Sequence, residues 1–174
     1  MPEPDREAWL RGPLPGVPPL LQPVAHALVQ ARDEVTALAE ECPPERLWDR
    51  PGGAASAGFH PQHLDGVLDR MLTYARGEAL SGDQLAALQA EGTPADASPA
   101  MLAERFARRV DEALAQLRET DVAALTEGRG VGREQLPSTL IGLLVHAAEH
   151  TTRHVGQLLV TVRVVAGGQT GGSS

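Results

Sequence analysis

The chain has 174 residues, which is enough for one domain with a sizeable hydrophobic core. Its net charge is −8, and this acidic balance argues against a nucleic-acid partner, because such a partner requires a basic patch. All 15 basic residues are arginines, which excludes lysine-dependent phosphate loops and Schiff-base chemistry.

The cysteine count, the first residues and the longest apolar run bear on the type of protein and on its location. The single cysteine, Cys42, excludes an intramolecular disulfide and a cysteine-based zinc cluster. The first residues have neither a basic start nor an apolar run, so we expect no signal peptide. The longest apolar run, residues 140–145, is too short to span a membrane. We therefore expect a cytoplasmic protein without a membrane partner.

Apolar residues recur at three- and four-residue steps in four stretches, which is typical of amphipathic helices. An extended arm is expected over residues 1–19. Long helices are expected over about 20–41, 61–77, 98–119 and 137–166, with a short helix over 83–91 and a loop over 126–135. The pattern predicts an all-α protein, a four-helix bundle over residues 20–167, followed by a flexible tail at 168–174.

Three of the six histidines, His146, His150 and His154, stand four residues apart in the last predicted helix. A four-residue step returns to nearly the same helix face, so the three imidazoles form a stripe. Two histidines at this spacing can hold one metal ion, as in helical zinc motifs. The alternative is a row of solvated or hydrogen-bonded histidines. Three in register on an apolar helix favour the metal site.

A metal held by two histidines lacks ligands, and His63 offers a third from another helix. It stands four residues before the apolar Val67 and shares its inward face. Three neutral imidazoles suit Zn, Ni, Fe or Cu. His26 is off the apolar stripe of its helix and is expected to be exposed. His60 precedes Pro61 and is expected outside the helix.

Two further residues of the last helix are candidates for accessory or catalytic roles. Glu149 could accept a hydrogen bond from a ligating imidazole or act as a base, although a salt-bridged or exposed carboxylate is an equal alternative. His146 could line a substrate mouth or form a hydrogen bond in the interior. Arg153 is expected at the surface or at a subunit contact.

Residues 14–166 resemble the DinB/YfiT-like superfamily of metalloenzymes. Three segments carry the resemblance: residues 58–77, which begin Gly-Phe-His-Pro-Gln-His; Leu-Pro-Ser-Thr at 136–139; and residues 146–157, which end His-Val-Gly-Gln. The last is the most specific, because the family's final helix typically completes its ligand pair with His-x-Gly-Gln.

The resemblance implies an up-down four-helix bundle with a long crossover connection, often homodimeric. It implies a divalent metal, Zn or Ni first and Fe, Mn or Cu as alternatives, held by His63, His150 and His154. By the same matching, His60 and His146 are accessory positions. The family name refers to induction by DNA damage, a stress response that concerns expression rather than DNA contact.

The resemblance also implies a class of activity. Characterised relatives include thiol-dependent S-transferases and a mycothiol-dependent isomerase, in which a metal activates a low-molecular-weight thiol. We therefore expect a metal-dependent enzyme with an open coordination position and a small-molecule substrate, performing thiol transfer or hydrolysis. The alternative is a non-catalytic, metal-stabilised helical dimer that binds a small molecule or a protein.

Overall fold

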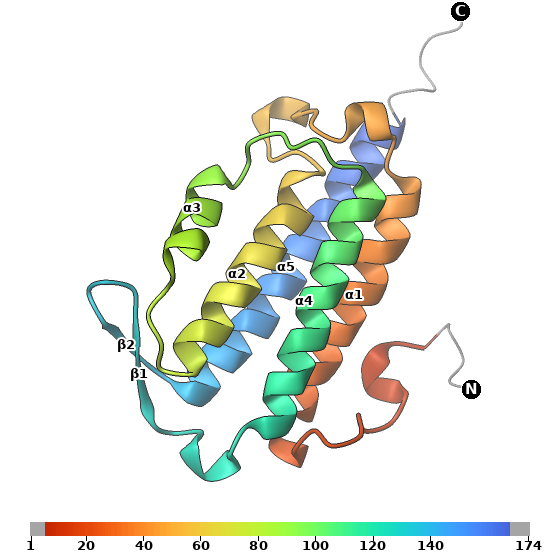
Figure 1. The fold of residues 1–174 in the computed structure, drawn as a ribbon. Coiled ribbons are helices and arrows are strands. Elements are labelled where there is room, and N and C mark those ends of the chain that lie inside the picture. The colour runs from red at the N-terminus through yellow and green to blue at the C-terminus, as the bar shows by residue number, and fades with distance from the viewer. Residues whose placement is uncertain (1–5, 168–174) are drawn as a thin grey trace, which may run out of the picture.

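Four long helices packed side by side form the protein (Figure 1). The structure, a computed structural model, describes residues 6–167. The long helices are α1 (Gln22–Glu41), α2 (Phe59–Ala75), α4 (Pro99–Glu119) and α5 (Leu140–Gly167). Each of α1 and α2 packs against both α4 and α5. The prediction of a mainly helical chain is confirmed.

Short elements connect the long helices. A fifth α-helix, α3 (Gly82–Ala90), lies in the connection from α2 to α4. Figure 1 shows that α2 and α4 run in the same direction, so this connection returns along the outside of the helices and carries α3 with it. Single 3-10 turns occur at Ala8–Leu10, Pro19–Leu21, Pro44–Arg46, Pro51–Gly53 and Val122–Ala124.

The core is built from the apolar stripes of the four long helices. Its largest fully buried side chains include Leu28 of α1, Leu64 of α2, Phe106 of α4 and Leu144 of α5. Burying each such side chain stabilises the fold by roughly 1.5–3 kcal/mol. This packing fixes the rotation of each helix about its axis and therefore the direction in which its polar residues point.

Local sequence signals define the start of α3 and attach it to α2. The Ser81 hydroxyl accepts a hydrogen bond from the Gln84 amide at 3.2 Å, and the Gln84 side chain accepts one from the Ser81 amide at 2.9 Å. This reciprocal cap, which is typical of a Ser-x-x-Gln pattern, begins the helix. The Gln84 side-chain amide also donates to Asp69 of α2 at 2.9 Å.

The start of α2 differs from the prediction. The helix begins at Phe59, so His60 is helical and buried rather than outside the helix. Pro61 occupies the third position of the first turn, where a backbone N–H has no intrahelical acceptor, and its missing donor therefore costs little. A Cβ on the preceding residue, Gly58, would lie only 2.8–2.9 Å from ring atoms of Trp48. Glycine at this position therefore lets the Trp48 ring lie against the start of α2.

A β-hairpin replaces part of the loop expected over residues 126–135. Strand β1 (Gly128–Val131) pairs antiparallel with β2 (Leu136–Thr139), with Gly128 opposite Thr139. The last helix, expected from about residue 137, therefore begins later, at Leu140, and residues 137–139 lie in β2. The turn needs two residues with positive φ, Gly132 at 69° and Gln135 at 51°.

The described part of the N-terminal arm, residues 6–21, lies against α1. The Ala8 amide donates to the side chain of Gln30 in α1 at 2.8 Å, and Ala8 and Val17 are buried. Residues 1–5 and the predicted flexible tail at 168–174 lie outside the described residues. Within residues 6–167, no helix has both the length and the apolar character needed to cross a bilayer.

Candidate metal centre

Three histidines from two helices meet between α2 and α5. One ring nitrogen from each of His63, His150 and His154 lies within 4.8 Å of the other two. His63 stands near the start of α2, and the other two occupy successive turns of α5. The Nε2 atoms of His63 and His150 are 2.9 Å apart. The three residues that the sequence predicted as ligands are therefore neighbours in space.

The spacing fits a single ion. Two imidazole nitrogens bound to one tetrahedral ion at roughly 2.1 Å lie about 3.4 Å apart. The 2.9 Å distance between Nε2 of His63 and Nε2 of His150 is shorter than this value, and the 4.8 Å limit for all three rings is longer. Small rotations of the rings would therefore bring the three nitrogens to the spacing that one ion requires. Three imidazoles are a donor set that suits late first-row metals. The residues present fit a divalent ion.

Burial keeps the imidazoles of His150 and His154 neutral. Desolvation, followed by the neighbouring charge of His63, lowers the pKa of His154 from 6.5 to about 4. The same two causes, in the same order, lower the pKa of His150. A neutral imidazole offers a lone pair, whereas a protonated one does not. Both rings can therefore donate to a cation at neutral pH.

A buried carboxylate that the sequence did not indicate holds His63. Glu91, directly after α3, places Oε2 2.7 Å from Nδ1 of His63, and its Oε1 accepts a hydrogen bond from Arg70. Burial raises the pKa of Glu91, but the hydrogen bonds from His63 and Arg70 outweigh it and leave the pKa below its ordinary value. The ionised carboxylate accepts a hydrogen bond from Nδ1 of His63, and the Nε2 atom of this ring faces Nε2 of His150.

His60 contacts the ring of His154, as Glu91 contacts the ring of His63. Its ring is buried, and its Nδ1 lies 3.2 Å from Nδ1 of His154. Burial, and then the charge of His63, lowers the pKa of His60 to about 4, so both rings are neutral at pH 7. One Nδ1 must then donate to the other. Where His154 is the donor, its Nε2 keeps a lone pair for a cation.

Glu149 and His146 lie away from this cluster, on the exposed face of α5. Glu149 pairs with Arg153, and its other oxygen is 3.3 Å from Nδ1 of His146, whose side chain is 50% exposed. The acceptor that holds a clustered imidazole is thus Glu91 and not Glu149. The ring centroids of His146 and His150 are 5.4 Å apart, so His146 extends the stripe towards solvent.

The sequence model of the DinB superfamily matches residues 27–158, about three quarters of the chain. The chain belongs to the DinB superfamily. The matched region contains α2 and the part of α5 that carries His150 and His154. A search of curated proteins finds no match.

Two cavities adjoin the histidine cluster of this DinB-superfamily protein. One, of about 430 Å³, is lined by Arg50, Phe59 and Glu91 among others. The other, of about 480 Å³, is lined by residues that include His60 and Arg153. The Phe59 ring stacks on the His63 ring, with centroids 5.1 Å apart and planes 12° from parallel. The two cavities thus border Phe59, Glu91 and His60, which contact the clustered rings, and none of the three clustered histidines lines either one.

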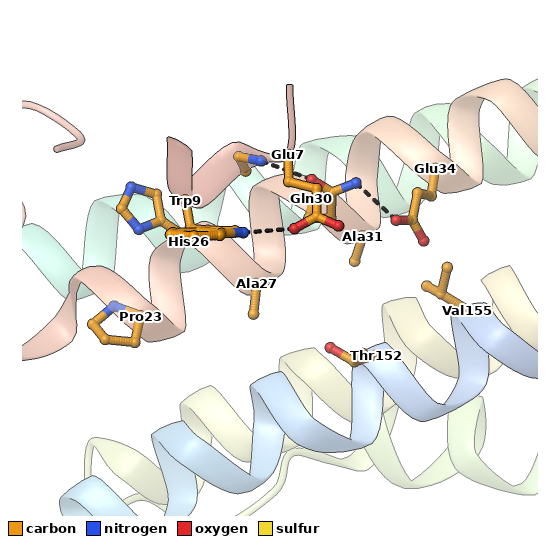
Figure 2. Close-up of a pocket in the computed structure, with 11 residues that line it drawn as sticks. Glu7, Trp9, Pro23, His26, Ala27, Gln30, Ala31, Glu34, Thr152 and Val155 are labelled. Carbon is orange, nitrogen blue, oxygen red and sulfur yellow. Dashed lines mark hydrogen bonds between the residues drawn. The ribbon is translucent and has the colours of Figure 1, made fainter. Parts of the chain in front are cut away.

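A separate cavity, of about 310 Å³, lies between the N-terminal arm, α1 and α5 (Figure 2). Trp9, His26 and Val155 line it, and none of the three clustered histidines does. The Trp9 indole donates to Glu7 at 2.6 Å, as drawn in Figure 2. His26 is half-buried, not exposed as predicted, and its Nε2 lies 3.0 Å from the Gly12 carbonyl oxygen.

Proposed function

We propose that this protein is a metal-dependent enzyme in which His63, His150 and His154 bind one divalent ion, with Zn or Ni favoured over Fe, Mn or Cu. The observation that carries the proposal is the convergence of one nitrogen from each ring within 4.8 Å. The lowered pKa values of His150 and His154 support it, because they keep the lone pairs free at neutral pH.

The reaction that we propose is thiol transfer to a small electrophile, with hydrolysis as the second choice. A divalent ion on three histidines keeps a position for a small thiol or water and lowers the pKa of that ligand. Glu91 and His60 hold two of the rings in place. Phe59 covers one face of His63, and we propose that a small substrate approaches from the cavity that Phe59 and Glu91 line.

We further propose the family's up-down bundle with a crossover, and a homodimer. The exposed apolar side chains Leu159, Val160 and Val164 of α5 support a contact with a second copy. The partners that we propose are small molecules, not nucleic acids or membranes, which agrees with the net charge of −8.

The test has two steps. Elemental analysis of the purified protein should find about one divalent ion per chain, and His63→Ala should lose it. Protein stripped with a chelator and reloaded with Zn²⁺, Ni²⁺ or Mn²⁺ is then assayed with low-molecular-weight thiols and electrophiles. Metal-dependent turnover that disappears in His63→Ala supports the enzyme. Stoichiometric metal without turnover in the full survey supports the alternative, a metal-stabilised binding module.

A further inference from the structure

We propose that Glu91 is a positioning residue of the metal centre, which fixes the ring of His63 and couples the crossover connection to metal binding. The inference rests on the proposed function above, because it assumes that His63 is a metal ligand. Glu91 lies 28 residues from His63 in the sequence and reaches it from the turn after α3. Three independent features support this role: a shielded hydrogen-bonded chain, a glycine that makes room for it, and a turn that contacts α2.

The hydrogen-bonded chain runs from Arg70 through Glu91 to His63. Each carboxylate oxygen has its own partner, with Arg70 donating to Oε1 and His63 lying 2.7 Å from Oε2. The side chains of Arg70, Glu91 and His63 are 8%, 11% and 16% exposed. Charge-assisted hydrogen bonds shielded from water in this way are stronger than exposed ones. Arg70 therefore holds the carboxylate still, and the carboxylate holds the ring.

Gly66 provides the space for this chain. A Cβ on Gly66 would lie 2.5 Å from Glu91 Oε1 and 2.8 Å from the Arg70 guanidinium, closer than real Cβ atoms approach. Glycine in a helix interior costs about 1 kcal/mol relative to alanine. Only a residue without a side chain lets the carboxylate lie against the backbone of α2 between His63 and Arg70.

The turn that carries Glu91 is itself attached to α2. The Gly92 amide donates to the Gln62 side chain at 2.8 Å, and that side chain donates to the Thr93 carbonyl at 3.3 Å. Gly92 has φ of +82°, and the Phe59 ring lies 3.4 Å from its Cβ position. One face of α2 therefore contacts the crossover connection through Phe59, Gln62 and His63.

Because His63 belongs to both the metal centre and the docked turn, binding at one must stabilise the other. Coupling between two sites is reciprocal, so an ion that fixes His63 makes the Glu91 contact more persistent, and the contact raises metal affinity. A carboxylate that only formed a structural ion pair with Arg70 would affect folding and leave metal affinity unchanged. Metal affinity therefore distinguishes a positioning role of Glu91 from a purely structural ion pair.

The first experiment measures Zn²⁺ affinity by competition with a chromophoric chelator for wild type, Glu91→Gln, Gly66→Ala and Glu149→Gln. Loss of a carboxylate behind a ligating histidine typically weakens metal binding 10- to 100-fold. We expect a loss of about that size for Glu91→Gln and a smaller loss for Gly66→Ala, which displaces the carboxylate without removing it. The matched control, Glu149→Gln, changes an exposed carboxylate one turn from His146 and should stay within about twofold of wild type. Co²⁺ absorption spectra should show altered ligand-field bands in Glu91→Gln and unchanged bands in Glu149→Gln.

The second experiment measures hydrogen exchange of residues 82–97 with and without Zn²⁺. Wild type should gain protection on adding the ion, and Glu91→Gln should lose that gain. The inference is overturned if wild type binds one ion and Glu91→Gln binds Zn²⁺ with an affinity within twofold of wild type. It is also overturned if hydrogen exchange of residues 82–97 in wild type does not change when Zn²⁺ is added. Should Glu91→Gln not fold, as judged by circular dichroism, Gly66→Ala decides in its place. A wild type that binds no metal overturns the proposed function instead.

Discussion

Replacing the histidines one at a time by alanine should divide them sharply into two groups. His63→Ala, His150→Ala and His154→Ala each remove a nitrogen from the group that lies within 4.8 Å. Removing only a hydrogen-bonding partner of a ligand weakens metal binding 10- to 100-fold. Removing a ligand itself should therefore cost more than about 100-fold, which is about 2.7 kcal/mol of binding free energy.

Two other histidines, His146 and His26, serve as controls. The ring of His146 contacts exposed Glu149 at 3.3 Å, and Nε2 of His26 lies 3.0 Å from the Gly12 carbonyl oxygen beside a different cavity. Neither belongs to the convergent group. His146→Ala and His26→Ala should therefore keep Zn²⁺ affinity within about twofold of wild type.

The assay is a competition titration. Each variant is stripped with a chelator, checked for folding by circular dichroism and titrated with Zn²⁺ against a chromophoric competitor. Elemental analysis of the reloaded protein gives the stoichiometry, expected at one ion per chain for wild type and both controls. Wild-type affinity in a folded His63→Ala variant would refute the assignment of His63. A 100-fold loss in His146→Ala would refute the placement of the site.

Three further outcomes are expected. His60→Phe removes the ring 3.2 Å from Nδ1 of His154 and should weaken Zn²⁺ binding about 10-fold in the same titration; unchanged affinity would show that this contact does not orient His154. Thr151→Val should raise the free energy of unfolding in urea by about 1 kcal/mol, because the buried Thr151 hydroxyl has no hydrogen-bond partner among residues 6–167; a lower midpoint would contradict this. Burial, with a smaller effect of Glu45, raises the pKa of the Cys42 thiol, so alkylation by iodoacetamide at pH 8 should be at least about 10-fold slower than for a free cysteine and should recover in guanidinium; a fast reaction in the folded protein would count against this environment.

The helices and the approximate place of the site could be predicted because their signals are local. The periodicity predicted a helix over 20–41, where the structure has Gln22–Glu41, and a helix over 98–119, where the structure has Pro99–Glu119. The shared face of His150 and His154 follows from 3.6 residues per turn alone. The inward direction of His63 follows from its spacing to Val67.

Other features depend on contacts between distant segments and could not be predicted. The hairpin of β1 and β2 has four-residue strands without clear alternation of apolar and polar residues, so its pairing depends on backbone hydrogen bonds across a turn. His60 is helical although it precedes Pro61, because the first turn of a helix tolerates proline, and the local sequence predicts only the disfavoured backbone before a proline.

What the sequence by itself determined is therefore a mainly helical chain of the DinB superfamily, with two histidines on one helix face and a third on another helix. Only the tertiary structure decided how these rings are held. Glu91 carries no periodic signal and reaches His63 because the connection from α2 to α4 docks on α2 at Gly66, while Glu149, the nearer carboxylate in sequence to the histidine pair, faces solvent. Helical periodicity specifies faces within an element, whereas a hydrogen bond between elements depends on how the whole chain packs.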